Sequence, residues 1–262
     1  RPIVNGTAKM ILMVDDDTAE IRTILREGLL FPVFQPIADF RIKGCLGFEA
    51  LIRGPEHSAL HMPGALFAAA AAEGVQRELE HAAREAALRA FVRLGLPGRL
   101  FLNVSPGVLM SDEWMNGQMT SLMHELGLAE NRVVIELTEN EQIAQVPDLL
   151  EGLQLLRGRG YQIAIDDLGE GFANLRMWSE VRPEYVKIDR HFVHGIASDR
   201  IKYHFVRAME DLAEICNAAL IAEGIESVED FECVRDMGIA CGQGYFIARP
   251  AAVPTPTLRE DL

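Results

Sequence analysis

Tyr161-Gln-Ile-Ala-Ile-Asp166-Asp167-Leu-Gly169-Glu-Gly171 is the stretch from which the fold can be read. Its first half is mostly apolar and includes two isoleucines, which indicates a short strand covered on both faces. Two adjacent carboxylates follow where the strand ends, and the glycines beyond them permit a sharp turn. Neighbouring carboxylates repel each other unless a cation or a shared proton lies between them. Taken alone, the stretch fits equally well a divalent-metal site at the mouth of an α/β fold and an ordinary exposed strand end.

The composition describes a globular, acidic chain. Its 262 residues are 49% hydrophobic and 24% charged, which fits one large α/β barrel or two smaller domains. The formal net charge of −14 argues against a nucleic-acid polymer as partner, because binding its backbone usually requires a basic face. A small phosphorylated substrate stays compatible with this charge, since bound divalent cations invert the local field.

The cysteines and the apolar runs indicate a cytoplasmic protein. Cys45, Cys216, Cys233 and Cys241 form no C-x-x-C pair and have no zinc-type spacing, so we expect reduced thiols. No apolar run reaches the roughly 18 residues that a membrane span needs, and no signal peptide is evident.

The sequence predicts three segments: a linker or capping helix at 1–30, a large domain at 31–252 and a tail at 253–262. Met10 to Leu30 resembles the first strand and helix of a response-regulator receiver domain, with Thr18 as helix N-cap. The likeness ends after about twenty residues, so a truncated receiver remnant is the lesser alternative. This N-terminal region also allows an upstream sensory or receiver domain as a partner of the chain.

Strands and helices then alternate along the chain. Strands are expected at Phe31–Ala38, Gly47–Arg53, Leu100–Ser105, Arg132–Leu137, Tyr161–Asp167, Tyr185–Ile188, Ala218–Glu223 and Ile239–Gln243. Helices are expected at Pro63–Glu73, Val75–Leu94, Ser111–Leu126, Glu141–Arg157, Phe192–Cys216 and Val228–Met237. The alternation predicts parallel strands with right-handed crossovers. The short first connection forces an antiparallel pair, so we predict a TIM-like, eight-stranded β/α barrel with one antiparallel strand.

Polar residues end nearly every expected strand. They are Glu49, Asn103, Glu136, Asp166, Asp167, Lys187, Glu223 and Gln243. In a barrel the carboxyl ends of the strands converge on one mouth, where active sites lie. Burying such groups unpaired would cost several kcal/mol each. We therefore expect a shared functional site at this mouth.

Seven ordered motifs between about Phe31 and Pro250 are similar to those of the EAL domain family, the cyclic di-GMP phosphodiesterases of bacterial signalling. They are Gln35-Pro-Ile, Asn103-Val-Ser-Pro, Glu136-Leu-Thr-Glu139, Asp166-Asp167-Leu-Gly, Val186-Lys187-Ile-Asp189, Ala222-Glu223-Gly-Ile-Glu226 and Gln243-Gly-Tyr, and they accompany the name-giving motif Phe48-Glu49-Ala-Leu51-Ile-Arg53.

The resemblance implies a two-metal site for Mg²⁺ or Mn²⁺. Its first metal would be held by Glu49, Asn103, Glu136 and Asp166, and Asp166 would bridge to a second metal that Asp167 also binds. Glu223 and Gln243 match residues that hold the waters of the second metal, and Lys187 matches the lysine that orients the attacking water. Two such cations can activate a shared water and stabilise the attacking and leaving oxygens. Hard oxygen ligands suit both metals.

The resemblance also implies substrate contacts and a braced loop. Gln35, Leu51, Arg53, Asp189, Glu226 and Gln243 match the substrate-binding positions. Glu139 resembles a glutamate that braces the loop carrying Gly169 and Gly171. Here the chain departs from the family pattern, because Ala173 replaces a serine that could hydrogen-bond Glu139. Asn174 or backbone N–H groups could take over that role, so the departure places loop order and turnover in question.

The leading hypothesis is hydrolysis of cyclic di-GMP to linear pGpG, because the ligand set is complete and Lys187 is present. A catalytically silent cyclic di-GMP receptor is the alternative, although receptors of this family commonly lose ligands. A purely structural partner-binding domain has no specific feature in its favour. A homodimer is expected, paired near the loop Leu168–Leu175.

Overall fold

A computed structural model describes residues 20–137, 148–168, 173–255 and 257 of the chain. The chain divides into two compact units. The first comprises residues 1–33 and 51–93, and the second comprises 34–50 and 94–262.

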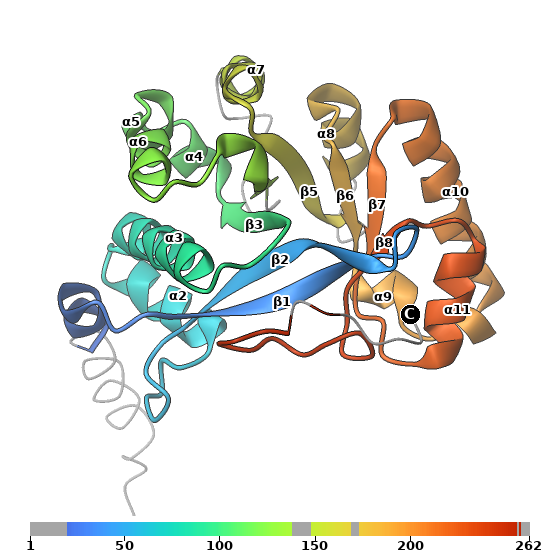
Figure 1. Cartoon of the computed structure of the whole chain (residues 1–262), viewed down its shortest axis with the longest axis horizontal. Coiled ribbons are helices and arrows are strands. Elements are labelled where there is room, and N and C mark those ends of the chain that lie inside the picture. Colours follow the sequence, from blue (N-terminus) through green and yellow to red (C-terminus); the bar gives the residue numbers. More distant parts are fainter. Residues whose placement is uncertain (1–19, 138–147, 169–172, 256, 258–262) are drawn as a thin grey trace, which may run out of the picture. The chain divides into compact units, whose positions relative to one another are not determined.

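The strands form a closed barrel in the order β1 to β8 (Figure 1). They are β1 (Phe31–Asp39), β2 (Gly44–Arg53), β3 (Arg99–Val104), β4 (Val133–Leu137), β5 (Gln162–Leu168), β6 (Tyr185–Ile188), β7 (Ala219–Ala222) and β8 (Cys241–Gly242). The neighbours from β2 through β8 pair in parallel, whereas β1 runs antiparallel to β8. This confirms the predicted barrel with one antiparallel strand. The last strand is shorter than the sequence indicated.

The barrel strands are apolar because both of their faces are covered. All residues of β4 and β6 are buried, including Glu136 and Lys187. The interior at one level is filled by a cluster with Ile37, Phe101 and Val134 among its members. Buried polar side chains in strands of this kind need a partner or a ligand. The polar residues at the strand ends are therefore the feature that the core does not explain.

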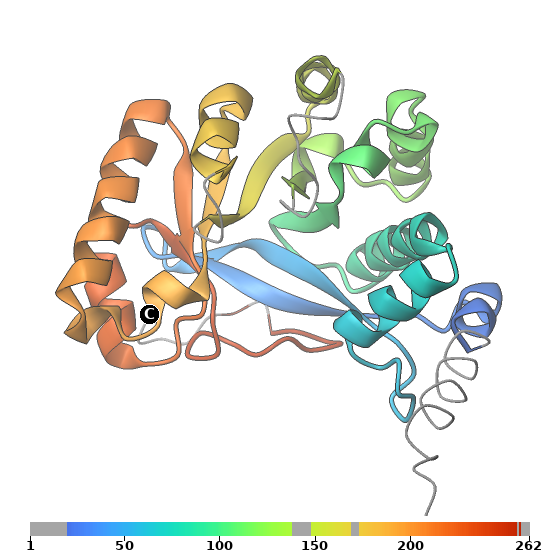
Figure 2. The same ribbon diagram turned by 180° about the vertical axis from the view of Figure 1, so that it is seen from behind.

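Helices follow the strands along the chain. They are α2 (Pro63–Ala72), α3 (Gln76–Arg93), α4 (Pro106–Leu109), α5 (Asp112–Met115), α6 (Gln118–Glu125), α7 (Leu149–Arg159), α8 (Ala173–Val181), α9 (Arg190–Val193), α10 (Arg200–Cys216) and α11 (Val228–Asp236). In the second unit, α7 and α8 lie against β5 and α10 lies against β7 on the outside of the barrel (Figures 1 and 2).

Two predicted helices are broken into shorter pieces. The helix expected at Ser111–Leu126 divides into α5 and α6, because Gly117 adopts a left-handed backbone with φ of 81°. The helix expected at Phe192–Cys216 is likewise divided by Gly195, whose φ is 77°. Asp199 then accepts hydrogen bonds from the first N–H groups of α10 and starts a new helix there.

The first unit has an apolar cluster of its own. Ile21 and Ile24, within helical residues 20–27, pack with Leu66 of α2 and Leu79 of α3. The expected helix at the N-terminus is thus present from residue 20, while Thr18 and the receiver-like strand lie outside the described residues. In the part of the chain that the structure describes, no helix combines the length and apolar character needed to cross a membrane.

Candidate active site

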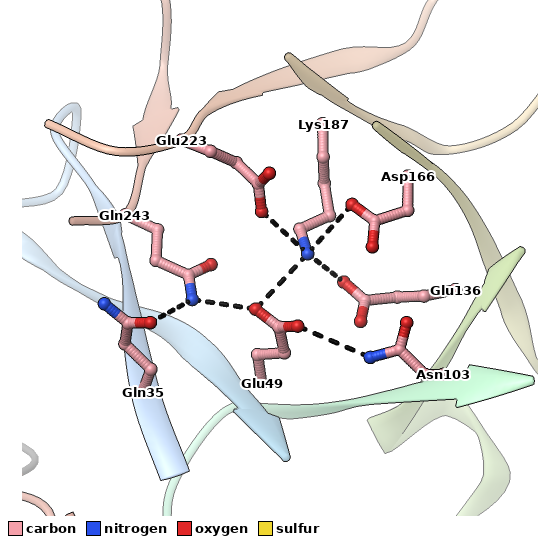
Figure 3. Close-up of polar contacts among 8 residues, drawn as sticks. All are labelled: Gln35, Glu49, Asn103, Glu136, Asp166, Lys187, Glu223 and Gln243. Carbon is pink, nitrogen blue, oxygen red and sulfur yellow. Dashed lines mark hydrogen bonds and ion pairs between the residues drawn. The ribbon is translucent and has the colours of Figure 1, made fainter. Parts of the chain in front are cut away.

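Eight polar side chains from the barrel strands and the loops after them point toward one another in the second unit (Figure 3). They are Gln35, Glu49, Asn103, Glu136, Asp166, Lys187, Glu223 and Gln243. Parallel register places Asn103 of β3 directly beside Glu136 of β4. Paired residues of neighbouring strands point to the same face of a sheet, so the register itself brings these two side chains together. Seven of the eight strand-end residues expected at the barrel mouth are thus brought together, with Gln35 beside them, whereas the side chain of Asp167 lies outside the described part of the chain.

Lys187 lies at the centre of the cluster, with a side chain that is 1% exposed. Its Nζ is 3.3 Å from Glu49 Oε2, 3.0 Å from Glu136 Oε1, 3.1 Å from Asp166 Oδ1 and 2.8 Å from Glu223 Oε1. An ammonium group has three N–H donors and no acceptor, so it suits a cage of carboxylate oxygens. One buried cation therefore links acids from four different strands and loops.

Side-chain amides fix the orientation of Glu49. Gln243 Nε2 donates to Glu49 Oε2 at 2.8 Å and to Gln35 Oε1 at 2.9 Å. Asn103 Nδ2 lies 3.4 Å from the other oxygen of Glu49. Gln35 is held in turn by its own donation to the carbonyl oxygen of Ala248 at 3.1 Å. Both oxygens of Glu49 thus have a defined direction before any ligand binds.

The electrostatics of the cluster are strongly negative, because four carboxylates surround the ammonium of Lys187. Burial raises the pKa of Glu136 well above its usual value despite the attraction of Lys187, and the charges of Glu49 and Asp166 add to the rise. Burial likewise raises the pKa of Glu223 to about 8, against the opposing effect of Lys187. Burial alone would lower the pKa of Lys187, but the surrounding carboxylates raise it well above its usual value. The cluster favours additional positive charge.

The donor set fits a divalent metal. Glu49, Glu136 and Asp166 each offer a carboxylate oxygen, and these oxygens all lie within 4.8 Å of one another. Among the described residues, the buried oxygens Glu136 Oε2 and Gln243 Oε1 have no hydrogen-bond partner. An unpartnered buried carboxylate oxygen is costly unless a ligand takes it up. Carboxylate and amide oxygens are the donors that Mg²⁺ and Mn²⁺ prefer.

Two residues predicted to bind the nucleotide make contacts within the protein. Asp189 caps α9 by accepting a hydrogen bond from the backbone N–H of His191. Glu226 lies 3.0 Å from Arg190 and 3.8 Å from His194. Sequence analysis missed Arg190, although it directly follows Asp189 at the end of β6. These contacts order the loops that follow β6 and β7.

The two other predicted substrate residues of the name-giving motif belong to the first unit. Leu51 and Arg53 lie among the last three residues of strand β2, and both are partly buried. Arg53 Nη1 donates to the carbonyl oxygen of Ile52 at 2.8 Å. Their roles toward a nucleotide stay predictions.

Several residues that were predicted to belong to the site, or to the loop beside it, lie outside the part of the chain that the structure describes. Asp167 belongs to β5, but its side chain is outside the described part of the chain, as is that of Ala173 at the start of α8. Glu139, Gly169 and Gly171 fall in the segments 138–147 and 169–172, which are not described. The second-metal ligand and the bracing of the loop therefore stay predictions.

A family model named EAL domain matches residues 18–250. The chain belongs to the EAL domain family. Among curated relatives, the probable cyclic di-GMP phosphodiesterases PdeI and PdeN of Escherichia coli K12 are 31% and 29% identical to it. Each alignment covers 88% of this chain, but only 30% of PdeI and 45% of PdeN. The chain thus spans about a third to a half of the length of these relatives. The motif resemblance is confirmed.

Solved structures agree with this assignment. A manganese and cyclic di-GMP complex of Klebsiella pneumoniae BlrP1 is 29% identical, with a TM-score of 0.77 over 85% of this chain and 56% of that one. A standalone EAL protein of Vibrio cholerae O395, solved with cyclic di-GMP, has a TM-score of 0.78 at 24% identity, over 88% of this chain and 95% of that one. The second likeness supports the fold alone.

Proposed function

We propose that this chain is a metal-dependent phosphodiesterase that hydrolyses cyclic di-GMP to linear pGpG. The observation that carries the proposal is the cage of four carboxylates around Lys187, in which a buried oxygen of Glu136 has no partner among the described residues. A scaffold gains nothing from this arrangement, because repulsion and burial both disfavour the charged acids. The names of the relatives and the ligands of the BlrP1 complex agree with this substrate and with a divalent metal.

Glu49, Asn103, Glu136 and Asp166 would hold a divalent metal, and Asp167 and Glu223 would complete a two-metal site. Bound Mg²⁺ or Mn²⁺ would lower the pKa of a coordinated water and neutralise charge on the phosphate. The amides of Asn103 and Gln243 keep Glu49 oriented toward this centre.

Lys187 would orient the attacking water and stabilise the charge that develops on the phosphate oxygens. In the metal-free chain the surrounding carboxylates raise its pKa. As an ammonium, Lys187 donates hydrogen bonds and has no lone pair to offer a metal. In the reaction, a bond forms between the water oxygen and phosphorus while the bond from phosphorus to the ribose 3′ oxygen breaks. The 3′ oxygen leaves as a hydroxyl with a proton from the attacking water, and the phosphate stays on the 5′ side.

Gln35, Leu51, Arg53, Asp189 and Glu226 are proposed to position the nucleotide. Arg53 can pair with a phosphate through two parallel N–H donors, which fixes its direction. Asp189 and Glu226 already order the loops beside the site through His191 and Arg190, so their effect on binding is indirect in part.

The second candidate function is a silent cyclic di-GMP receptor. The feature in its favour is Ala173, which replaces the serine that braces the catalytic loop in the family pattern. The ligand residues, by contrast, are all retained. The receptor and the enzyme differ in one respect that experiment can separate, namely turnover after binding.

Glu49→Ala separates the two functions. We expect the purified wild-type chain to form pGpG in Mg²⁺ or Mn²⁺, and the variant to bind cyclic di-GMP without hydrolysing it. Exposed Glu232 on α11 offers a matched control, and Glu232→Gln should keep full turnover. Binding without turnover by the wild-type chain in either metal would make it a receptor. If Glu49→Ala changed neither binding nor turnover, the assigned site would be wrong.

A further inference from the structure

The backbone around Arg53 is held on both sides by one apolar cluster. Before Arg53 in the chain, Ile52 packs against the cluster of the first unit that contains Leu66 and Leu79. After it, Leu60 is a buried member of the same cluster. The guanidinium of Arg53 also donates to the carbonyl oxygen of Ile52 at 2.8 Å, so a movement of Ile52 moves the guanidinium as well. Packing in the first unit therefore sets where Arg53 lies.

A tight loop connects Arg53 to Leu60. The N–H of Gly54 donates to the carbonyl oxygen of His61 at 3.0 Å, and the carbonyl oxygen of Gly54 lies 2.9 Å from Nδ1 of His61. A carbonyl oxygen only accepts, so Nδ1 carries the proton in this contact. A Cβ on Gly54 would lie 2.3 Å from the carbonyl oxygen of Leu60, which only glycine avoids. The two ends of the loop are thus locked together.

The helix at residues 20–27 completes the cluster. Ile21 and Ile24 are three residues apart and lie on one side of this helix, and both are fully buried in the cluster. On another side, Nε of Arg22 donates to Oε2 of Glu73 at 2.6 Å, at the C-terminal end of α2. Figures 1 and 2 show the helix beside α2 and α3. Apolar packing and one ion pair therefore fix it to the first unit.

The metal ligand and the substrate residues of the name-giving motif belong to different units. Glu49 lies in the second unit, together with the other carboxylates around Lys187, whereas Leu51 and Arg53 lie in the first. A change confined to the cluster of the first unit should therefore alter the affinity for the nucleotide and leave the affinity for the metal unchanged.

We propose that the helix at residues 20–27 positions Arg53 for the nucleotide, acting through Ile52 and through the loop from Gly54 to His61. This inference rests on the proposed function, in which Arg53 contacts a phosphate. With Ile24 packed in the cluster, the strand end is ordered before the nucleotide binds. Without that packing, binding has to order it, and the affinity falls. A displacement of this helix thus adjusts substrate affinity without any change at the metal ligands.

Steady-state kinetics of the full chain with cyclic di-GMP tests the role of the helix. Ile24→Ala should raise KM by roughly 2- to 30-fold, the usual range for a coupled residue that contacts no ligand. Its kcat should hardly change, because a phosphate contact that is equally strong in the bound substrate and in the transition state affects KM alone. Its affinity for Mn²⁺ in a calorimetric titration should equal that of the wild-type chain.

Ile239→Ala is the matched control for this variant. Ile239 is as buried as Ile24, at 1% exposure, but it lies in the second unit just before β8. Its replacement should lower Tm to a similar extent and leave KM unchanged. An unchanged KM for Ile24→Ala would overturn the proposal. An equal rise of KM in both variants would also overturn it, because the effect would then follow from lost stability.

His61 gives a second test that leaves the apolar cluster intact. His61→Ala removes the donor that holds Gly54, and KM should rise while kcat stays the same. An asparagine places its amide N–H close to the position of Nδ1, so His61→Asn should bring KM back toward the wild-type value. His57 is an exposed residue of the same loop, and His57→Ala should have no effect. A wild-type KM for His61→Ala would refute the route through this loop, as would a His61→Asn variant that is equally impaired.

The wild-type chain shows whether a failure concerns this inference or the proposed function. If it binds cyclic di-GMP without hydrolysing it, the dissociation constant replaces KM and the same changes are expected. If it neither binds nor hydrolyses cyclic di-GMP, the proposed function and the positioning role both fail. Normal turnover by the wild-type chain, together with an unchanged KM for Ile24→Ala, overturns the positioning role alone.

Discussion

Lys187→Met removes the cation on which four carboxylates converge, and it keeps most of the volume of the side chain. In the metal-free chain, each of the four acids lies 2.8–3.3 Å from Nζ. Without the ammonium these charges face each other in a site that water hardly enters. We expect the metal-free variant to be much less stable than the wild-type chain.

The magnitude follows from the distances. At an effective dielectric of about 20, two unit charges 3 Å apart attract each other by about 5–6 kcal/mol. Four such contacts would give a gross attraction of about 20 kcal/mol if every acid were charged, and the raised pKa of Glu136 and Glu223 makes the actual attraction smaller. Most of it offsets the desolvation of the buried charges. Removing one partner of a buried ion pair typically lowers the free energy of unfolding by about 3–5 kcal/mol. At roughly 2–4 °C per kcal/mol for a chain of this size, Tm should fall by about 10 °C.

Added metal should separate the structural role of Lys187 from its catalytic role. A divalent cation that binds only to the folded chain raises the free energy of unfolding by about 2.7 kcal/mol when its concentration is 100 times its Kd. The variant should gain more than the wild-type chain, because it has lost the ammonium of Lys187 that faces these carboxylates in the wild-type chain. We therefore expect Mg²⁺ or Mn²⁺ to restore most of the lost Tm without restoring turnover.

Thermal unfolding with chelator and with metal, next to a turnover assay, measures both effects. Lys43→Met is the matched control, because Lys43 is an exposed lysine in the turn between β1 and β2. The Tm of this control should stay close to that of the wild-type chain, because surface substitutions usually change the free energy of unfolding by no more than about 0.5 kcal/mol. A Lys187→Met variant as stable as the wild-type chain in chelator would refute the role of Lys187 as the partner of the acids. Recovery of turnover with metal would refute its catalytic role.

Three further predictions concern the ligands and the loops. Glu136→Gln should lower Mn²⁺ affinity by at least about 10–100-fold in a calorimetric titration, since it removes a buried ligand; unchanged affinity would place the metal elsewhere. Ala173→Ser should raise turnover if the missing hydroxyl weakens the bracing of the loop, and equal or lower turnover would show that the loop is ordered differently. Gly224→Ala should unfold more readily than Gly238→Ala, because both glycines have a left-handed backbone but only at Gly224 would a new Cβ meet Arg190, at 2.2 Å. Equal losses in chemical denaturation would show that Arg190 moves aside freely.

The barrel and the residues at its mouth could be predicted from the sequence because they depend on patterns that repeat along the chain. Alternation of buried strands with helices sets the parallel order. Polar residues at the ends of nearly all of these strands then mark the mouth, as Glu136 and Lys187 show. The strongly apolar runs around these residues predict that they are buried.

Features that depend on single turns or on contacts between loops could not be predicted in this way. Gly117 and Gly195 break helices whose apolar pattern continues across the break, so periodicity alone favoured longer helices. The ion pair of Arg190 with Glu226 joins two loops that only the closed barrel brings together. The sequence also gave no sign that Lys187 contacts four acids at once, because side-chain reach is set by the packed barrel.

The most direct test of the central claim is hydrolysis of cyclic di-GMP by the purified chain in ¹⁸O-labelled water with Mn²⁺, followed by mass spectrometry of the product. We predict linear pGpG with a single ¹⁸O atom in its 5′ phosphate, and no product in excess chelator. Product that forms equally well in chelator would contradict the account, as would saturable binding of cyclic di-GMP without any turnover in Mn²⁺ or Mg²⁺.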